Sequence, residues 1–443
     1  MLDVILRPWL LIVVVAVGLL WMGIAWVRRP LTGIQGLILI LLFAPLYPVP
    51  GIEYVFYTFA IFSSLMLLIW LISAFRKVIA RETNNNYRPL AIGLKNWLLM
   101  CFLGLPLSLL FNRGHLSDRL FYFIKGFLPF WYLCGFFIVW RFRPEVREAK
   151  KILRSILVTA AGFAVLSWVI YAATGGRVTW FYHPLAFPFV VLGANIAFVY
   201  FLSAQKLSRQ LRWAALIGFF IAAIVFTFTK AQMIALLCGF ALVIGILQGP
   251  SHPTALRKSI ALALSGLLIG IVLIFSFAHN EVDTFTDILS ARMTDAGTTG
   301  TRLEEWKDAI LEFTQSPIIG KGVGFQLERT EFDETITAGY VHNQVVYTAM
   351  TMGVIGLGIY IFILSQWVRL VFRTRFAASQ QKSLLAACHA CILSLLTYSL
   401  MFAGFRTIQH NFLLGVLLAL TATLTPGFEG DGGRVKEHRT EHM

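Results

Sequence analysis

The chain has 443 residues, of which 58% are hydrophobic and 13% are charged, and it carries a formal net charge of +15. Apolar runs of about 20 residues recur along most of its length, which is typical of helices that span a membrane, and their lack of alternation excludes a β-barrel. The basic residues lie mainly in short segments between these runs. Their charge therefore reflects membrane orientation and does not indicate nucleic acid as a partner.

The first apolar run, residues 8–27, is followed by Arg28, Arg29 and a second run, without a small-residue cleavage site. It predicts a retained helix and not a removed signal peptide. We expect an all-α polytopic membrane protein with about 12 or 13 transmembrane helices, the lower number applying if one early run is re-entrant. The predicted spans are residues 8–27, 31–48, 54–75, 90–111, 120–140, 153–172, 184–204, 213–229, 231–248, 259–278, 343–368, 383–403 and 411–425.

The segments between spans alternate between a set rich in Lys and Arg and a set with fewer basic residues. The richer set is predicted to be cytoplasmic by the positive-inside rule; it comprises residues 28–29, 76–88, 141–151, 205–212, 256–258, 369–376 and the C-terminal tail. The second set, predicted to face outward, comprises residues 112–119, 174–183, 227–232, 279–342 and 404–411. The expected organisation is a helix bundle over 1–278, a large outer loop over 279–342, further spans over 343–425 and a cytoplasmic tail over 426–443.

The segment 279–342 is too long for a simple connection, and loops of that length are usually functional or disordered. Its stretch TRLEEWKDAILEF, residues 301–313, places Leu303, Trp306, Ile310 and Phe313 on one helical face. This pattern predicts an amphipathic helix along the outer membrane surface. Thr301 and Glu304 fit a capping box at its start, Ser316-Pro317 is expected to end it, and GKGVG at 320–324 is expected to form a flexible turn.

Two basic residues are candidates for binding an anion. Arg302 would follow the predicted cap, beside the free N–H groups of a helix start, where both donors and dipole favour negative charge. Lys230 interrupts a long apolar stretch between two spans, where a charge is costly and is often functional. A solvated surface Arg and a snorkelling Lys are the structural alternatives, and snorkelling is the preferred interpretation of Lys95 and Lys125.

His342 closes the long outer loop with Asn343 beside it, at the start of an apolar run. An imidazole there suits a general base, although a lone interfacial His is more often structural. Further candidates on the predicted outer side are Arg177, His183, Arg406 and His410. The sequence CHAC at 388–391 lies within a span, which favours buried thiols over a metal site. No cluster of acidic residues indicates a metal.

The region GTRLEEWKDAILEFTQSPIIGKGVGF (300–325), followed by HNQVVYTAMTMGVIGLGIYIFIL (342–364), resembles the signature region of the O-antigen ligase and Wzy-polymerase superfamily. The shared pattern is an Arg, a following Trp, P-x-x-G-x-G-x-G, then His-Asn and a Gly-rich span. The resemblance implies an inverting, metal-independent glycosyltransferase of the GT-C type, without a cofactor. Such an enzyme would lie in the bacterial inner membrane, with its active site facing the periplasm and membrane lipids around it.

By the same resemblance, the donor would be a glycan on undecaprenyl pyrophosphate, and the acceptor either lipid A-core, for a ligase, or another lipid-linked glycan, for a polymerase. Arg302 matches a pyrophosphate-binding arginine and His342 the histidine that activates the acceptor. Lys230, in Thr229-Lys230-Ala231, stands where the family has an arginine in a Ser-Arg-Gly-like turn. The ligase is favoured; a polymerase, a flippase of lipid-linked oligosaccharides and a scaffold in a cell-envelope assembly are the alternatives.

Overall fold

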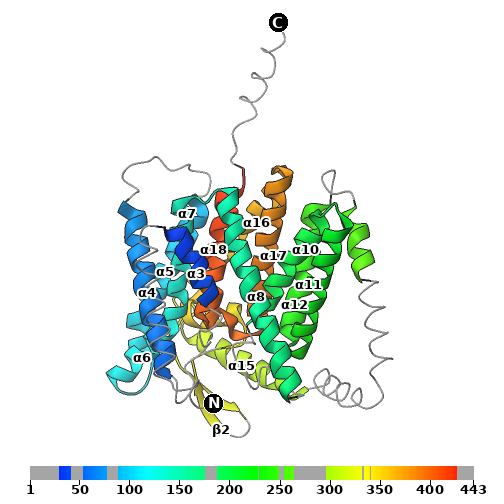
Figure 1. Cartoon of the computed structure of the whole chain (residues 1–443). Coiled ribbons are helices and arrows are strands. Elements are labelled where there is room, and N and C mark those ends of the chain that lie inside the picture. Colours follow the sequence, from blue (N-terminus) through cyan, green and yellow to red (C-terminus); the bar gives the residue numbers. More distant parts are fainter. Residues whose placement is uncertain are drawn as a thin grey trace, which may run out of the picture.

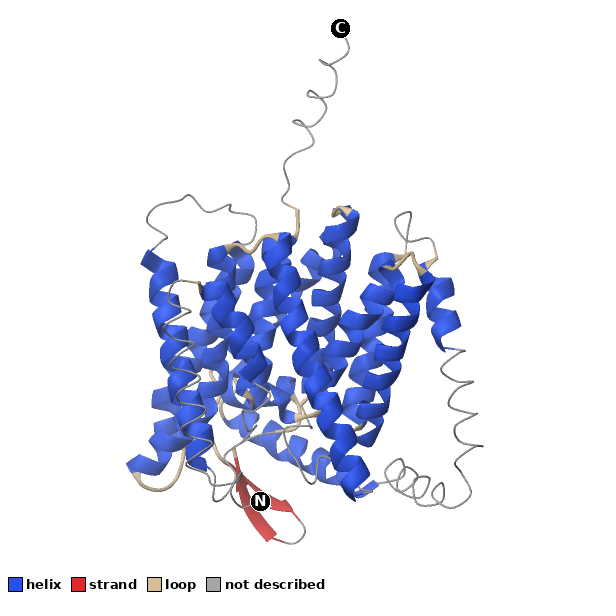
Figure 2. Ribbon diagram, in the orientation of Figure 1, coloured by secondary structure: helices blue, strands red, loops and turns tan. Residues whose placement is uncertain are grey.

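A computed structural model of the chain describes residues 29–40, 53–76, 88–174, 187–227, 229–248, 254–263, 296–331, 334–339 and 341–426. The described residues form a bundle of roughly parallel and antiparallel helices with one helix lying across its end (Figures 1 and 2). The elements are α3 (Pro30–Ile40), α4 (Glu53–Arg76), α5 (Arg88–Phe111), α6 (Leu116–Trp131), η3 (Tyr132–Cys134), α7 (Gly135–Phe142), α8 (Val146–Thr174), α10 (Phe189–Ser203), α11 (Leu207–Phe226), α12 (Lys230–Leu247), α15 (Ala296–Gln315), β1 (Leu327–Glu331), β2 (Glu334–Ala338), α16 (Gln344–Arg373), η5 (Thr374–Phe376), α17 (Ser379–Met401), η6 (Ala403–Arg406) and α18 (Ile408–Leu424).

Within these residues, seven helices are long and apolar enough to cross a membrane, which confirms the expected all-α polytopic membrane protein. Shorter apolar helices are present in α3, α4, α10 and α18. Eleven of the thirteen predicted spans coincide with described helices, counting α6, η3 and α7 as one. The span predicted at 8–27, residues 41–48 of the second span and most of 259–278 lie outside the described residues.

Burial separates central from peripheral helices. Nearly every residue of α10 and α18 is buried, so these mostly apolar helices form the centre of the bundle. Peripheral helices expose large apolar side chains, such as Leu103 on α5 at 50% and Val169 on α8 at 58%. Apolar exposure of this extent indicates a surface that faces lipid.

Where the structure describes them, the two sets of connecting segments lie at opposite ends of the bundle (Figure 1). At the α15 end, Arg113 in the α5–α6 turn forms an ion pair with Glu328 on β1, 3.3 Å apart. At the other end, the Lys258 ammonium donates to the carbonyl of Ala204 at 2.8 Å, and Ser203 hydrogen-bonds Ser383. The alternation read from the charges therefore corresponds to two real ends of the molecule, and their membrane sidedness remains a prediction.

The segment before α16 contains more structure than expected. Helix α15 is present and ends at Gln315, directly before Ser316-Pro317, as predicted. It begins at Ala296, however, so Thr301 lies inside the helix and the proposed capping box is wrong. Arg302 accordingly does not lie beside free N–H groups at a helix start. Strands β1 and β2, which the sequence did not predict, form an antiparallel hairpin with Leu327 opposite Ala338.

The GKGVG segment is a buried, packed loop and not a flexible turn. Helix α16 is broken at Gly353, whose φ of 62° and ψ of −162° are non-helical. The carbonyls of Met350 and Thr351, on the N-terminal side of this break, accept hydrogen bonds from the N–H groups of Lys321 and Gly322, both at 2.9 Å. The loop thereby satisfies backbone groups that a break in a membrane helix exposes.

Close backbone approach explains the glycines of this region. Gly320 has a φ of 71°, and a Cβ there would collide with the backbone at Thr351 and Met352. The loop also lies against two helix glycines: a Cβ on Gly104 or Gly126 would come within 2.7 Å of a loop amide nitrogen. The tight fit fixes the loop and, through it, the position of α15.

Candidate functional site

The His342 imidazole is paired with a carboxylate from α15. Glu305 Oε2 lies 2.9 Å from His342 Nδ1, and Glu305 Oε1 accepts a hydrogen bond from the His342 backbone N–H at 2.5 Å. The Glu305 side chain is only 2% exposed, whereas that of His342 is 22% exposed. An ionised carboxylate can only accept, so Nδ1 carries the proton and Nε2 of the neutral ring carries the lone pair.

Arg302 lies one helical turn before Glu305 on α15, on the half-buried side of the helix. Burial lowers the pKa of the Arg302 guanidinium, while the nearby Glu305 carboxylate and Tyr398 on α17 act to raise it. Arginine keeps its charge throughout the ordinary pH range. A permanent cation therefore lies next to the Glu305–His342 pair, although not at the helix start where the sequence placed it.

Asn343 has a structural task. As the N-cap of α16, its side-chain oxygen accepts hydrogen bonds from the backbone N–H groups of Val345 and Val346, at 2.9 and 3.1 Å. Its amide nitrogen donates to the carbonyl of Leu400 at the end of α17, at 3.2 Å. These contacts fix where α16 starts, and so hold His342 in place.

Lys230 is the first residue of α12 and is exposed. Helix α12 packs along α17: the Ser394 hydroxyl on α17 donates a hydrogen bond to the Ala235 carbonyl on α12, at 2.7 Å. Tyr398, which interacts with Arg302, lies one turn further along α17. Among the described residues Lys230 makes no hydrogen bond or ion pair with Arg302, Glu305 or His342, so the structure does not join its side chain to the pair.

The structure brings Arg406 toward the same region from another side. Its charge interacts with Lys125 on α6 and with Tyr347, which follows His342 by five residues. His410 is fully buried, and its Nε2 lies 3.2 Å from the Ser399 hydroxyl, so it packs between α17 and α18. Arg177 and His183 lie outside the described residues.

The CHAC sequence contains a buried histidine with both ring nitrogens engaged. His389 Nδ1 accepts from the Trp367 indole at 3.1 Å, and its Nε2 lies 2.9 Å from the Thr374 hydroxyl. Cys388 and Cys391 are buried free thiols. Across the described ranges, no group of three or more His, Cys, Asp or Glu side chains has a metal-binding arrangement.

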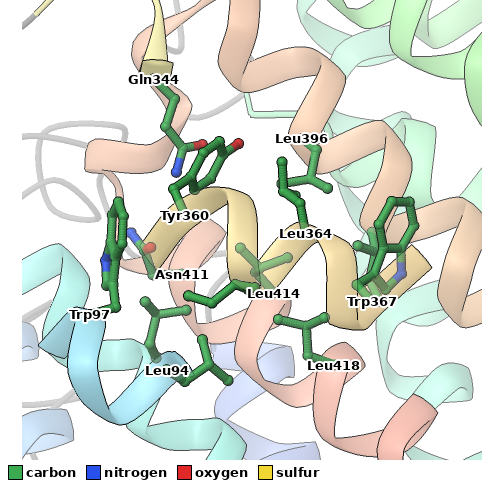
Figure 3. Close-up of a pocket in the computed structure, with 13 residues that line it drawn as sticks. Leu94, Trp97, Gln344, Tyr360, Leu364, Trp367, Leu396, Asn411, Leu414 and Leu418 are labelled. Carbon is green, nitrogen blue, oxygen red and sulfur yellow. The ribbon is translucent and has the colours of Figure 1, made fainter. Parts of the chain in front are cut away.

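A narrow cavity lies inside the bundle, between α5, α16, α17 and α18 (Figure 3). Gln344 and Tyr360 are at one end, with Trp367 and Leu418 at the other. Its volume, about 30 Å³, can hold one or two water molecules but not a sugar.

These features define a multi-pass membrane protein in which a helix across one end of the bundle supplies an arginine and the carboxylate of a carboxylate–histidine pair. Residues 213–361 match the family model described as O-antigen ligase. The match confirms the resemblance to the O-antigen ligase and Wzy-polymerase superfamily, and it supports a ligase- or polymerase-type function in general. No curated protein matches the chain.

The matched residues run from α11 to the first half of α16 and contain Lys230, Arg302, Glu305 and His342. Glu305 was not among the site residues expected from the sequence, because it lies off the apolar face formed by Leu303, Trp306, Ile310 and Phe313. One signal was available: Glu305 follows Arg302 by three residues, so both side chains lie on one face of a helix. The sequence did not indicate which residue pairs with Glu305. That residue is His342, 37 positions later in the chain.

Proposed function

We propose that the protein is a membrane glycosyltransferase that transfers a glycan from undecaprenyl pyrophosphate to an acceptor hydroxyl, on the periplasmic side of the bacterial inner membrane. The observation that carries this proposal is the Glu305–His342 pair next to Arg302, within the residues that match the O-antigen ligase family. A buried carboxylate behind a partly exposed imidazole is the arrangement that a general base requires.

In the proposed reaction, His342 Nε2 takes the proton of the acceptor hydroxyl as the hydroxyl oxygen attacks the anomeric carbon of the donor sugar. The bond between that carbon and the pyrophosphate oxygen breaks, and its electron pair leaves with the pyrophosphate. Attack opposite the leaving group inverts the anomeric configuration. Glu305 holds the ring tautomer and stabilises the imidazolium, while general-base assistance typically contributes roughly 10² to 10⁴ in rate.

Arg302, with Lys230 at the start of α12, is proposed to bind the pyrophosphate. Negative charge develops on the leaving group, and a fixed cation 4 Å away stabilises it by on the order of 4 kcal/mol at an effective dielectric constant of about 20. Lysine at position 230 keeps the charge of the family's arginine but not its two-pronged geometry. Neither role requires a cofactor or a metal.

Within this class a ligase that uses lipid A-core is favoured, and a Wzy-type polymerase that uses a second lipid-linked glycan is the alternative. The test is a transfer assay with the purified full-length protein in vesicles, with chelator, a glycan on undecaprenyl pyrophosphate, and each acceptor separately. Transfer to lipid A-core that is lost in His342→Ala supports the ligase, and lengthening of the lipid-linked glycan supports the polymerase.

A flippase of lipid-linked oligosaccharides is the alternative from another class. Full-length surface glycan made in cells by both His342→Ala and Arg302→Ala, at normal protein levels, would refute the transferase. Movement of the labelled donor across the vesicle membrane, without transfer to any acceptor, would then favour the flippase.

A further inference from the structure

An apolar groove that opens toward the membrane lies between α4 and α6, with a volume of about 500 Å³. It is lined on α4 by Ile61, Leu65 and Leu68, and on α6 by Phe121, Ile124 and Lys125. Ile61 is 59% exposed, and Leu65 and Ile124 are each 51% exposed, so an apolar molecule in the bilayer reaches these side chains directly. The volume lies within the range of ordinary ligand sites, roughly 300–1,000 Å³.

Lys125 makes this groove different from a plain lipid-facing surface. It is exposed, and it lies nine residues after the start of α6, about 13 Å along the helix axis. Among the described residues no carboxylate lies within 4 Å of its ammonium group; the interacting charge is a second cation, Arg406 on η6. Helix η6 packs against α6, so Arg406 belongs to an element in contact with the helix that carries Lys125, and two cations near an apolar surface favour an anionic ligand.

Arg406 connects the groove to the candidate active site. Its charge also acts on Tyr347, whose ring lies 5.0 Å from that of Phe405. Tyr347 lies in the first turn of α16, five residues after His342. The His342 ring itself contacts Phe402, which immediately precedes η6. Lys125, which lines the groove, is therefore connected through Arg406 and η6 to side chains that contact His342 or closely follow it in the chain.

The groove and the proposed pyrophosphate site approach the His342 region from different sides. Figure 1 shows α4 and α6 at one edge of the bundle and α11 and α12 at the opposite edge, with α15 across the end between them. Arg302 and Lys230 belong to α15 and α12. A transferase that joins two membrane-bound molecules needs two such approaches, because both substrates must be present at once.

We infer that the α4–α6 groove binds the chains of the acceptor, a phosphate-bearing lipid, with Lys125 and Arg406 holding its phosphate and its reactive hydroxyl directed toward His342. The inference rests on the proposed function. Lys and Arg side chains next to an apolar groove suit the phosphate of a lipid whose chains occupy that groove. An ordinary annular phospholipid, the donor, or the chain's own residues 8–27 are the competing occupants.

Photo-crosslinking tests occupancy without requiring catalysis. A photoreactive phenylalanine analogue is placed at Leu65, and at Val165 on the lipid-facing side of α8 as a matched control that is 53% exposed. The full-length protein is irradiated in vesicles that contain ordinary phospholipid and either labelled lipid A-core or labelled donor. Crosslinking of lipid A-core at Leu65 several-fold above the Val165 level is the expected result.

Preferential crosslinking of the donor, of residues 8–27, or of phospholipid equally at both positions would overturn the inference. Crosslinking measures binding and not catalysis. A lack of transfer, which counts against the proposed function, is therefore distinguishable from an empty groove.

If transfer is observed, Lys125→Ala is expected to raise the acceptor KM at least about tenfold with the donor KM unchanged, and Lys125→Arg to restore it. Lys95→Ala, on the exposed side of α5, is the charge-matched control. An unchanged acceptor KM in Lys125→Ala would also refute the inference.

Discussion

Replacing Glu305 with Gln tests the carboxylate–histidine pair most directly. Glu305 accepts two hydrogen bonds from His342, from the backbone N–H at 2.5 Å and from Nδ1 at 2.9 Å. An amide has a single acceptor oxygen. The backbone N–H of His342 can only donate, whereas Nδ1 can donate or accept, depending on the tautomer. The amide oxygen of the Glu305→Gln side chain is therefore expected to accept from the backbone N–H, which leaves its NH₂ group facing Nδ1. The ring proton then moves to Nε2, which can no longer accept a proton.

We expect Glu305→Gln to lower kcat roughly 10²- to 10⁴-fold, the usual contribution of a general base. At 1.36 kcal/mol for each factor of ten, this loss corresponds to about 2.7 to 5.4 kcal/mol of transition-state stabilisation. Donor and acceptor KM should change little, because Glu305 acts through His342 and does not touch either substrate in the proposed mechanism. Glu305→Asp keeps the charge and should restore part of the rate.

The measurement is the initial transfer rate of purified protein in vesicles, as a function of each substrate, with thermal unfolding as a check of folding. Glu304→Gln is the matched control: its carboxylate is 62% exposed and pairs with Lys307, an interaction worth about 0–1 kcal/mol. A folded Glu305→Gln protein that keeps more than about a third of the normal kcat would refute the proposed role.

Three further predictions concern the supports of the site and its second cation. Gly353→Ala should destabilise the protein by roughly 1–3 kcal/mol, because φ is 62° and a Cβ would meet the backbone of Ile318. Gly358→Ala, with open space around it, should be neutral or mildly stabilising, and thermal unfolding in detergent compares the two variants. Asn343→Ala should lose about 1 kcal/mol of stability with the N-cap, and Asn343→Asp should keep both the cap and most of the activity; an Asp variant as inactive as His342→Ala would instead indicate a chemical role. Lys230→Arg should retain or raise the transfer rate if this side chain binds pyrophosphate, and a loss as large as that of Lys230→Ala would show that it serves packing.

The sequence alone determined the helical membrane architecture and the approximate limits of most spans. In a bilayer each backbone polar group must be satisfied within its own segment, so a long apolar run has few alternatives to a helix. It also determined where α15 ends, because a proline after Ser316 cannot continue the helix. His342 became a candidate for a similar reason: with Asn343 it forms a polar pair at the edge of an apolar run.

Only the tertiary structure decided what those residues contact. The hydrogen bonds that define the site join Glu305 to His342 and Asn343 to Leu400, across 37 and 57 residues of chain, and no local periodicity encodes such pairings. The same limit explains the error over GKGVG. Three glycines in five residues indicate flexibility when read locally, but here they let the loop pack against a broken helix and satisfy its carbonyls. Local sequence fixes backbone preference, whereas burial and partner choice depend on which distant helix arrives beside it.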